Sequence, residues 1–244
     1  MKAIAIIPAR LESTRLPRKV LRQIAGKPML AYVYEAVRGA SGLAEVLVAT
    51  DSEEVAALAH ERGWSVRMTS SAHRSGTERV HEVAASMAAD VYLNVQGDEP
   101  LARPEHIAAL LAPFADAAVQ VATLKTPCSA ADVSNANAVK VVTDLSARAL
   151  YFSRAAIPHD RDASGSVRYF KHLGFYAYRK TALDRFAALA ESALERAERL
   201  EQLRFLENGI PIHVTETPYD TIGVDTEEDL KRVEGILAKR AVRK

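Results

Sequence analysis

Cysteine is almost absent from this chain of 244 residues, in which Cys128 is the only one. A single cysteine cannot form an internal disulfide, and it leaves no cysteine-based zinc site to build. We therefore expect a protein of a reducing compartment, the cytoplasm.

Long apolar runs are also missing. The N-terminal run, residues 3–7, is cut by Pro8 and Arg10 and is too short for the apolar region of a signal peptide. No other run approaches the roughly 20 residues of a transmembrane helix. The sequence predicts a soluble protein that does not enter a membrane.

Neither sign of charge dominates, because 32 Lys and Arg face 31 Asp and Glu, for a formal net charge of +1. Proteins that bind nucleic acid or a membrane surface generally carry a basic excess, so the sequence argues against both partners. A local group of arginines can still bind a small anion inside a neutral protein.

Four common catalytic motifs do not occur in the sequence. The chain has no GxxxxGK[ST] and no GxGxxG, which argues against a P-loop NTPase and a nicotinamide dehydrogenase. It also lacks HExxH and the GxSxG elbow, which argues against a zinc protease and a serine hydrolase.

What the sequence does contain is a regular alternation of strands and helices up to about residue 126. Apolar runs predict strands at residues 3–7, 45–50, 65–69, 90–95 and 117–126. Helical spacing predicts helices at residues 28–38, 55–63, 77–89 and 104–114. This order is typical of an α/β fold with a mostly parallel central sheet and helices on both faces, three layers in all.

The second half of the sequence is less regular. We expect strands at residues 138–143, 175–178 and 212–215, and helices at 181–188, 191–207 and 226–242. No linker separates two domains, so residues 1–244 are predicted to form a single domain with an inserted lobe at about residues 130–190.

Ligands bind beyond the carboxyl ends of parallel strands, and the polar loops 8–27, 70–79 and 96–100 all follow predicted strands. We therefore expect these loops to meet at one crevice. The first of them contains six cations, which suit a phosphate chain, although a basic loop that is merely solvated is the alternative. The six are Arg10, Arg15, Arg18, Lys19, Arg22 and Lys27.

Two aspartates follow apolar segments and a glycine. Asp98 lies in the segment VQGDEP and Asp225 in IGVD, and either carboxylate could hold Mg²⁺ against substrate phosphates. The alternative for both residues is an ordinary turn or helix cap. The segment SGTER, residues 75–79, has the same ambiguity, because it could contact a nucleobase or only cap a helix.

Taken together, nine segments closely resemble one family, the 3-deoxy-manno-octulosonate (Kdo) cytidylyltransferases, also called CMP-Kdo synthetases. They occur in the order of that family and span nearly the whole chain. The segments are IIPARLESTRLPRKVL (6–21), GKPML (26–30), VATD (48–51), SGTER (75–79), NVQGDEP (94–100), ALYFSRAAIP (149–158), KHLGFYAY (171–178), LEQLRFLENG (200–209) and GVDTEEDL (223–230).

The resemblance implies a Rossmann-like nucleotidyltransferase fold, a homodimer formed through the inserted lobe, and a Mg²⁺-dependent reaction. That reaction joins CTP and Kdo to give CMP-Kdo and pyrophosphate, for lipopolysaccharide biosynthesis.

The resemblance also assigns roles by position. Arg15, Lys19, Asp98 and Asp225 would be catalytic, and Asp98 and Asp225 would bind the metal. CTP would be bound by Pro8, Ala9, Arg10, Arg15, Lys19, His73, Ser75, Gly76, Thr77, Arg79 and Gln96. The sugar acid would be bound by Arg154, His172, Glu201 and Gln202.

The sequence departs from the family's usual pattern at two positions. Arg18 stands where the family commonly has glycine, which affects how Lys19 is placed, and Ala72 stands where an aspartate often precedes His73. Two alternatives stay open. One is a cytidylyltransferase for another sugar acid, such as 8-amino-Kdo or a nonulosonic acid, and the other is a nucleotide-binding protein without activity.

Overall fold

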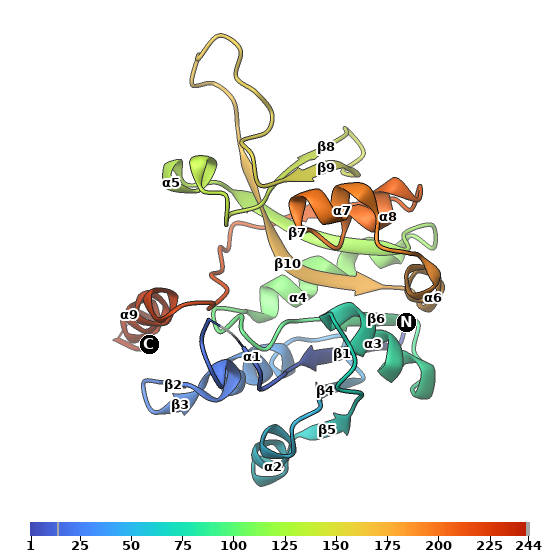
Figure 1. Cartoon of the computed structure of the whole chain (residues 1–244), viewed down its shortest axis with the longest axis vertical. Coiled ribbons are helices and arrows are strands. Elements are labelled where there is room, and N and C mark those ends of the chain that lie inside the picture. Colours follow the sequence, from blue (N-terminus) through green and yellow to red (C-terminus); the bar gives the residue numbers. More distant parts are fainter. Residues whose placement is uncertain (14, 243–244) are drawn as a thin grey trace. The chain divides into compact units, whose positions relative to one another are not determined.

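The computed structural model describes residues 1–13 and 15–242, and side chains as far as residue 240. Two units can be distinguished along the chain. Met1–Ala108 and the segment from Thr221 onward form the first unit, and Ala109–Asp220 forms the second. Figure 1 shows the trace and the element labels used below.

Four parallel strands form the centre of the first unit, in the order β6-β1-β4-β5. All six residues of β1 are buried, as expected for a strand covered on both faces. This arrangement confirms the predicted parallel sheet. The strands are β1 (Ala3–Pro8), β4 (Glu45–Thr50), β5 (Ser65–Met68) and β6 (Val91–Asn94).

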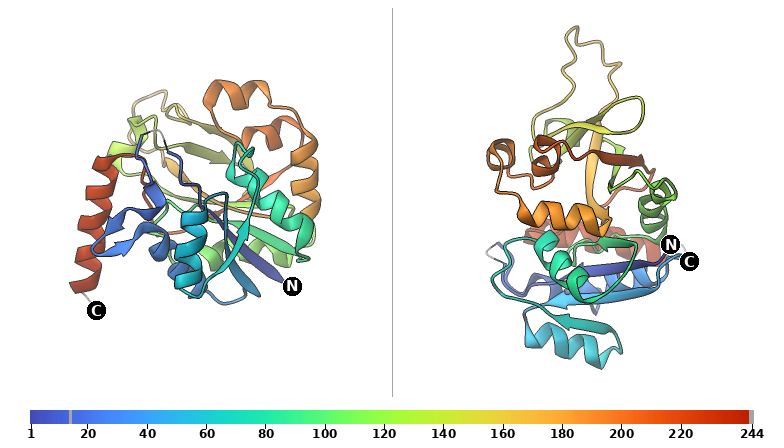
Figure 2. Two further views of the ribbon diagram at one scale, coloured as in Figure 1. Left: turned by 60° about the horizontal axis from the view of Figure 1, so that its bottom comes forward. Right: turned by 90° about the vertical axis from the view of Figure 1, so that its right-hand side faces the viewer.

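Helices α1 (Met29–Arg38), α2 (Glu53–Glu61) and α3 (Gly76–Ser86) connect these strands. The chain moves outward from β1 through β4 to β5 and then returns across the sheet to β6. Since parallel crossovers are right-handed, the returning helix α3 must lie on the face opposite α2. The right-hand view of Figure 2 shows α2 and α3 on opposite sides of these strands, which gives three layers.

The basic loop after β1 is held in place by the last helix, α9 (Glu227–Val242). Leu230 and Val233 of α9 pack in one apolar cluster with Leu16 and Ile24 of the loop. The loop also contains a short helix and an antiparallel pair of strands. These elements are η1 (Lys19–Leu21), β2 (Gln23–Ile24) and β3 (Lys27–Pro28).

Arg18 adopts the left-handed conformation that glycine takes readily, with φ 58° and ψ 30°. Its carbonyl oxygen accepts a hydrogen bond from the backbone of Leu21 at 2.9 Å, which begins the η1 turn. Its side chain forms an ion pair with Glu54. The replacement of glycine therefore does not unfold the turn that begins at Lys19.

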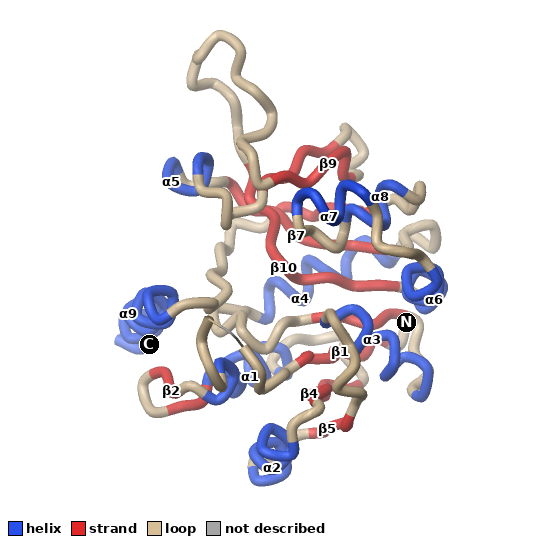
Figure 3. Tube along the Cα trace, viewed as in Figure 1, coloured by secondary structure: helices blue, strands red, loops and turns tan. Residues whose placement is uncertain are grey.

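The second unit has a mixed set of strands. Strand β7 (Val121–Pro127) pairs in parallel with β11 (Ile212–Glu216) and antiparallel with β10 (Phe170–Tyr178). Strands β8 (Lys140–Thr143) and β9 (Ala149–Ser153) form an antiparallel pair, and β8 also pairs with β10. Figure 3 shows the long loop between β9 and β10.

The helices of the second unit are short: α5 (Ala130–Ser134), α6 (Lys180–Ala188), α7 (Ala193–Glu198) and α8 (Leu203–Glu207). The helix predicted at residues 191–207 is two helices, because Arg199 has a positive φ of 55° and ends α7. Helix α4 (Pro104–Leu111), followed by η2 (Ala112–Ala115), contains the boundary between the units. The second unit is thus wider than the lobe predicted at residues 130–190.

No helix in the described part of the chain is both long enough and apolar enough to cross a membrane.

Candidate functional site

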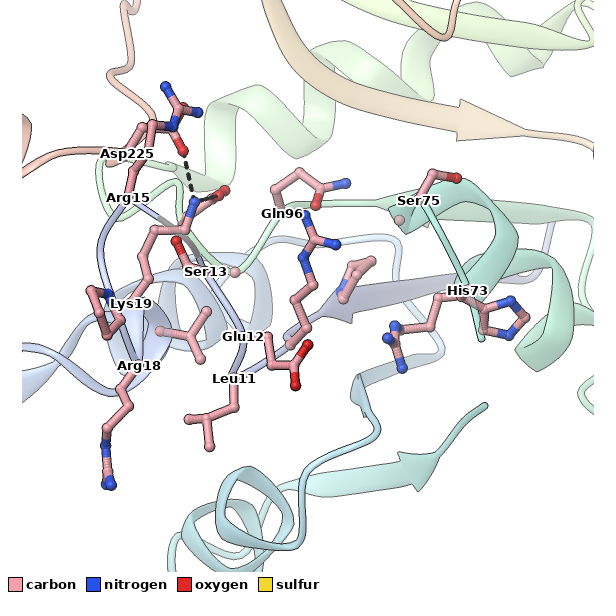
Figure 4. A pocket seen from close by; sticks show the side chains of 18 of the residues that line it. Leu11, Glu12, Ser13, Arg15, Arg18, Lys19, His73, Ser75, Gln96 and Asp225 are labelled. Atoms are coloured by element: carbon pink, nitrogen blue, oxygen red, sulfur yellow. Dashed lines mark hydrogen bonds and ion pairs between the residues drawn. The ribbon is translucent and has the colours of Figure 1, made fainter. Parts of the chain in front are cut away.

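A cavity of about 670 Å³ lies in the first unit, at the carboxyl ends of its parallel strands. Its walls come from the basic loop after β1, the segment that leads into α3, the turn after β6 and Asp225, two residues before α9 (Figure 4). The loops predicted to meet do so here. The lining residues are Pro8, Arg10, Leu11, Glu12, Ser13, Arg15, Pro17, Arg18, Lys19, Val20, His73, Arg74, Ser75, Gly76, Arg79, Gln96, Gly97, Asp98 and Asp225.

Four of the six cations of the basic loop line the cavity, namely Arg10, Arg15, Arg18 and Lys19. The other two are engaged elsewhere. Arg22 forms an ion pair with Glu227 at 2.6 Å, and Lys27 forms one with Glu35 at 2.5 Å. The prediction that all six face a phosphate chain is therefore wrong for Arg22 and Lys27.

Lys19 lies between the two aspartates that the sequence singled out. Its Nζ is 2.5 Å from Oδ2 of Asp98 and 2.9 Å from Oδ1 of Asp225. Arg15 contacts the other oxygen of Asp225, Oδ2, at 2.8 Å. Two carboxylates far apart in sequence thus converge on one cation. Figure 4 labels Lys19, Arg15 and Asp225 of this group.

The protonation equilibria of this group follow from the contacts. Burial by itself lowers the pKa of Lys19, but Asp98 and Asp225 outweigh it and raise the pKa above its ordinary value. Burial by itself raises the pKa of Asp225, but Lys19 and Arg15 hold it below the usual range. At neutral pH Lys19 is therefore an ammonium and Asp225 a carboxylate.

The segments that carry the aspartates are joined directly. The backbone N–H of Val224 donates to the carbonyl oxygen of Asp98 at 2.9 Å. Gly97 lets the turn lie against β1, since a Cβ there would be 3.0 Å from the carbonyl oxygen of Pro8. Backbone contacts therefore set the distance between Asp98 and Asp225.

The positions of Asp98 and Asp225 suit a magnesium ion, because both carboxylates already contact one cation, the ammonium group of Lys19. Among the residues described, no three His, Cys, Asp or Glu side chains form a metal-binding group. This finding is compatible with Mg²⁺, which proteins commonly hold through one or two carboxylates while substrate phosphates supply further ligands.

The segment before α3 does cap a helix. The hydroxyl of Ser75 accepts a hydrogen bond from the backbone N–H of Glu78 at 3.2 Å, as an N-cap does. The next residue, Gly76, allows close approach, because a Cβ at that position would collide with the side chain of Gln96. Gln96 in turn donates to Asn94 at 2.7 Å. Capping and lining the cavity are thus combined in one segment.

Arg79 lines the cavity, but its charge is neutralised within the protein. Its side chain is only 4% exposed, and its guanidinium contacts Asp51 at 2.9 Å and the hydroxyl of Thr69. These contacts join the first turn of α3 to the ends of β4 and β5. The geometry favours Arg79 as a group that fixes the cavity wall.

The remaining predicted CTP residues differ in their placement. His73 lines the cavity and contacts the carboxylate of Glu82. Ala9 and Thr77 are buried and do not line the cavity. The N–H of Ala9 donates to the carbonyl oxygen of Ala49, and the hydroxyl of Thr77 accepts from the amide of Asn94.

The four residues predicted to bind the sugar acid all belong to the second unit. Arg154 donates from its guanidinium to three backbone carbonyl oxygens, those of Glu198 at 2.7 Å, Ala136 at 3.0 Å and Arg199 at 3.4 Å. Its present contacts therefore hold the end of β9 against the end of α7.

His172 packs edge-on against Phe152, with ring centres 5.0 Å apart, and its Nε2 is 3.0 Å from the hydroxyl of Thr123. Burial lowers the pKa of His172 to about 3. The ring is therefore neutral at physiological pH, and it can recognise a ligand through a hydrogen bond but not through charge.

Gln202 is buried, and its side-chain nitrogen Nε2 has no hydrogen-bond partner among the described atoms. A buried amide donor without a partner is costly, so a ligand that accepts its hydrogen bond would be favoured. The adjacent Glu201 is half-buried. It lies near Tyr176, whose pKa is raised well above its usual range by burial first and then by Tyr178 and Glu201.

Sequence reasoning missed several lining residues, most notably Glu12 and Arg74. Both lie in loops that were predicted to form the crevice, so position along the chain was the only available signal. Glu12 is a carboxylate in an otherwise basic loop, and its type gave no reason to expect it beside a phosphate site.

Comparison with known proteins identifies the family. The family model for cytidylyltransferases matches residues 4–216 of the chain. A 3-deoxy-manno-octulosonate cytidylyltransferase from Koribacter versatilis is 67% identical over 240 residues, which cover 98% of this chain and 92% of the relative. The chain belongs to this family of cytidylyltransferases.

Two further comparisons agree with this assignment. A 3-deoxy-manno-octulosonate cytidylyltransferase from Acidobacterium capsulatum is 60% identical, with 98% of both chains covered. A solved structure of a CMP:2-keto-3-deoxy-manno-octonic acid synthetase in complex with CTP has 45% identity and a TM-score of 0.94. That match covers 98% of this chain and all of the other, and it confirms the predicted nucleotidyltransferase fold.

Proposed function

We propose that the protein transfers CMP from CTP to the anomeric hydroxyl of Kdo, giving CMP-Kdo and pyrophosphate. The observation that carries this proposal is the convergence of Asp98 and Asp225 on one cation in a cavity lined with arginines. In the reaction, the hydroxyl oxygen of Kdo bonds to the α-phosphorus of CTP. The bond to the bridging oxygen breaks, pyrophosphate leaves, and the hydroxyl proton passes to solvent.

The cations of the cavity would bind and orient the triphosphate. Arg10, Arg15 and Lys19 can donate charge-assisted hydrogen bonds to phosphate oxygens, and these bonds strengthen as charge gathers on the leaving pyrophosphate. Such transfers depend mainly on positioning and on stabilisation of phosphate charge. Asp98 and Asp225 would hold Mg²⁺, which supplies divalent positive charge to the phosphate oxygens.

The base and ribose would lie against the segment before α3 and the turn after β6. Gln96, Ser75 and Gly76 line that part of the cavity, and the amide of Gln96 is oriented by Asn94. A side-chain amide and exposed backbone groups can distinguish cytosine from other bases by hydrogen bonding.

Kdo would be recognised by residues of the second unit. The unpartnered amide of Gln202 and the neutral ring of His172 offer hydrogen bonds to sugar hydroxyls. Arg154 would pair with the sugar carboxylate, exchanging one of its present carbonyl contacts for a charged partner. Glu201 would accept from a sugar hydroxyl.

We further propose a cytoplasmic homodimer that supplies CMP-Kdo for lipopolysaccharide biosynthesis. In support of the dimer, the β8–β9 hairpin carries two exposed leucines, Leu145 and Leu150, the second of them 61% exposed. Exposed apolar side chains on one hairpin would contribute to an apolar patch of the kind that marks protein interfaces.

The proposal is tested by incubating the protein with CTP, Mg²⁺ and Kdo and measuring pyrophosphate release. The assay is repeated with UTP, ATP and GTP, and with 8-amino-Kdo and a nonulosonic acid in place of Kdo. We expect the highest kcat/KM for CTP with Kdo. A higher value for another acid would reassign the sugar, and CTP binding without turnover on any acid would indicate a nucleotide-binding protein.

A further inference from the structure

The ammonium group of Lys19 contacts the same carboxylate oxygens that a metal ion would need. Three of the four oxygens of Asp98 and Asp225 already accept from a cation. Lys19 takes one oxygen of each aspartate, and Arg15 takes the second oxygen of Asp225. A divalent ion that bridged both aspartates would take the place between them that the ammonium group now occupies.

The charges of this cluster are balanced without any ion. Arg15 and Lys19 contribute two positive charges, and Asp98 and Asp225 contribute two negative charges. A divalent ion entering alone would add two positive charges directly beside an ammonium group that is only 13% exposed. Because like charges repel strongly where water is partly excluded, entry of the ion alone is disfavoured.

A triphosphate changes this balance. It brings several negative charges into the cavity that Lys19 lines, and the lysine side chain is flexible enough to turn from a carboxylate to a phosphate oxygen. The carboxylate oxygens that it leaves then become available. The same event therefore binds the nucleotide and opens the metal site.

We infer that Lys19 controls the order of binding, in that its ammonium group keeps the Asp98–Asp225 pair closed to a divalent ion until a triphosphate draws it away. This inference rests on the proposed function, because it takes the aspartate pair as the metal site. The nucleotide therefore enters before the ion or together with it.

Lys19→Met tests the inference, because it removes the charge and keeps most of the side-chain length. Mn²⁺ alone is titrated into the protein without any nucleotide, and the free ion is measured by its electron paramagnetic resonance signal. We expect Lys19→Met to bind Mn²⁺ about tenfold or more tightly than the wild type, within the usual range of coupling between sites.

Two control variants show whether a change in Mn²⁺ affinity comes from the lost charge or from a general disturbance of the structure. Lys19→Arg keeps a cation at this position and should bind Mn²⁺ as weakly as the wild type. Lys27→Met makes the matched substitution at a lysine that pairs with Glu35 outside the cavity, and it too should behave as the wild type. Circular dichroism checks folding, and Lys19→Gln replaces the methionine variant should that variant fail to fold.

A second measurement, the affinity for CTP, should change in the opposite direction. CTP is titrated in EDTA, without metal, and Lys19→Met should bind it about tenfold or more weakly, because a charged donor to phosphate is lost. A loosened fold would weaken both ligands, whereas the inference requires Mn²⁺ to bind more tightly and CTP more weakly.

The inference is overturned if the wild type and Lys19→Met bind Mn²⁺ equally, or if neither binds it. It is also overturned if Lys19→Arg gains as much affinity as Lys19→Met. Because these titrations contain no sugar acid and no turnover, their outcome is independent of the assay for CMP-Kdo. Failure of that assay would remove the proposed function and leave the Mn²⁺ result standing.

Discussion

The hydroxyl of Thr221 donates a hydrogen bond to Oε2 of Glu99 at 2.6 Å, and both side chains are buried. Glu99 follows Asp98 directly, and Thr221 lies shortly before Asp225. This bond, together with the one from Val224 to the carbonyl of Asp98, ties the segments that carry the two carboxylates. Glu99 and Thr221 are therefore positioning residues for the aspartate pair.

On the proposed function, Thr221→Val should lower kcat about tenfold or more and leave the KM for CTP nearly unchanged, since Asp98 and Asp225 would be displaced while Arg10 and Arg15 stay in place. The buried Glu99 oxygen would lose this donor, so the free energy of unfolding should fall by about 1–3 kcal/mol. Steady-state kinetics and urea unfolding measure both effects. Thr221→Ser, which keeps the hydroxyl, should restore kcat, and a valine variant with the kcat of the wild type would contradict the positioning role.

The ion pair between Arg79 and Asp51 should contribute more to stability than to catalysis. Arg79→Met leaves Asp51 without its guanidinium partner, and we expect a loss of roughly 2–4 kcal/mol, near the lower end for broken buried pairs because Asp51 is partly exposed. Urea unfolding measures the loss. The double variant Arg79→Met/Asp51→Asn should recover part of it, because no unpaired carboxylate remains. If Arg79 instead binds CTP directly, Arg79→Met would raise the KM for CTP without loss of stability.

Most of the site's framework could be predicted from local sequence. The apolar run of β1 and the turn signals after β6 place their loops at one edge of a parallel sheet, and Asp98 directly follows Gly97 at that edge. Asp225 follows no strand, because β11 ends at Glu216 and residues 217–225 are irregular, so its place beside Asp98 could not be predicted from a strand end. The partners of charged side chains could not be predicted in this way. Asp51 lies 28 residues from Arg79, and no local pattern indicates that this arginine is neutralised by it.

Two features of the secondary structure were not predicted, namely strand β9 and the break between α7 and α8. Strand β9, with the sequence ALYFS, was not predicted, because it has only five residues and so short an apolar run does not distinguish a strand from a helix. The break between α7 and α8 depends on the positive φ of Arg199, which the residue type does not suggest. Secondary structure is thus least predictable where a non-glycine residue takes a left-handed conformation.

Arg18 allows a test of that kind of strain. Replacing alanine by glycine normally destabilises a protein, but at a left-handed position glycine avoids a clash worth about 1–2 kcal/mol. Arg18→Ala and Arg18→Gly both lose the ion pair with Glu54, so the comparison between them isolates the backbone. We expect Arg18→Gly to be more stable than Arg18→Ala by about 1 kcal/mol in urea unfolding. The opposite order would show that the backbone at residue 18 is not strained.

His172 should make the protein sensitive to acid. Its pKa is about 3 in the folded state, against about 6.5 for an unfolded chain, so between these values the unfolded state binds a proton that the folded state does not. The stabilising contribution is complete above pH 6.5 and is lost as pH falls toward 3, by at most about 1.4 kcal/mol per pH unit.

His172→Gln should therefore flatten the dependence of unfolding free energy on pH between about 6.5 and 3, whatever its effect on stability at neutral pH. Urea unfolding at several pH values, compared with the wild type, measures the difference in slope. His213, whose pKa is also lowered by burial, is present in both proteins and cancels in the comparison. The same substitution at an exposed histidine, His159→Gln, is measured alongside as the matched control. Equal slopes for His172→Gln and the wild type would mean that the His172 ring accepts a proton in the folded protein.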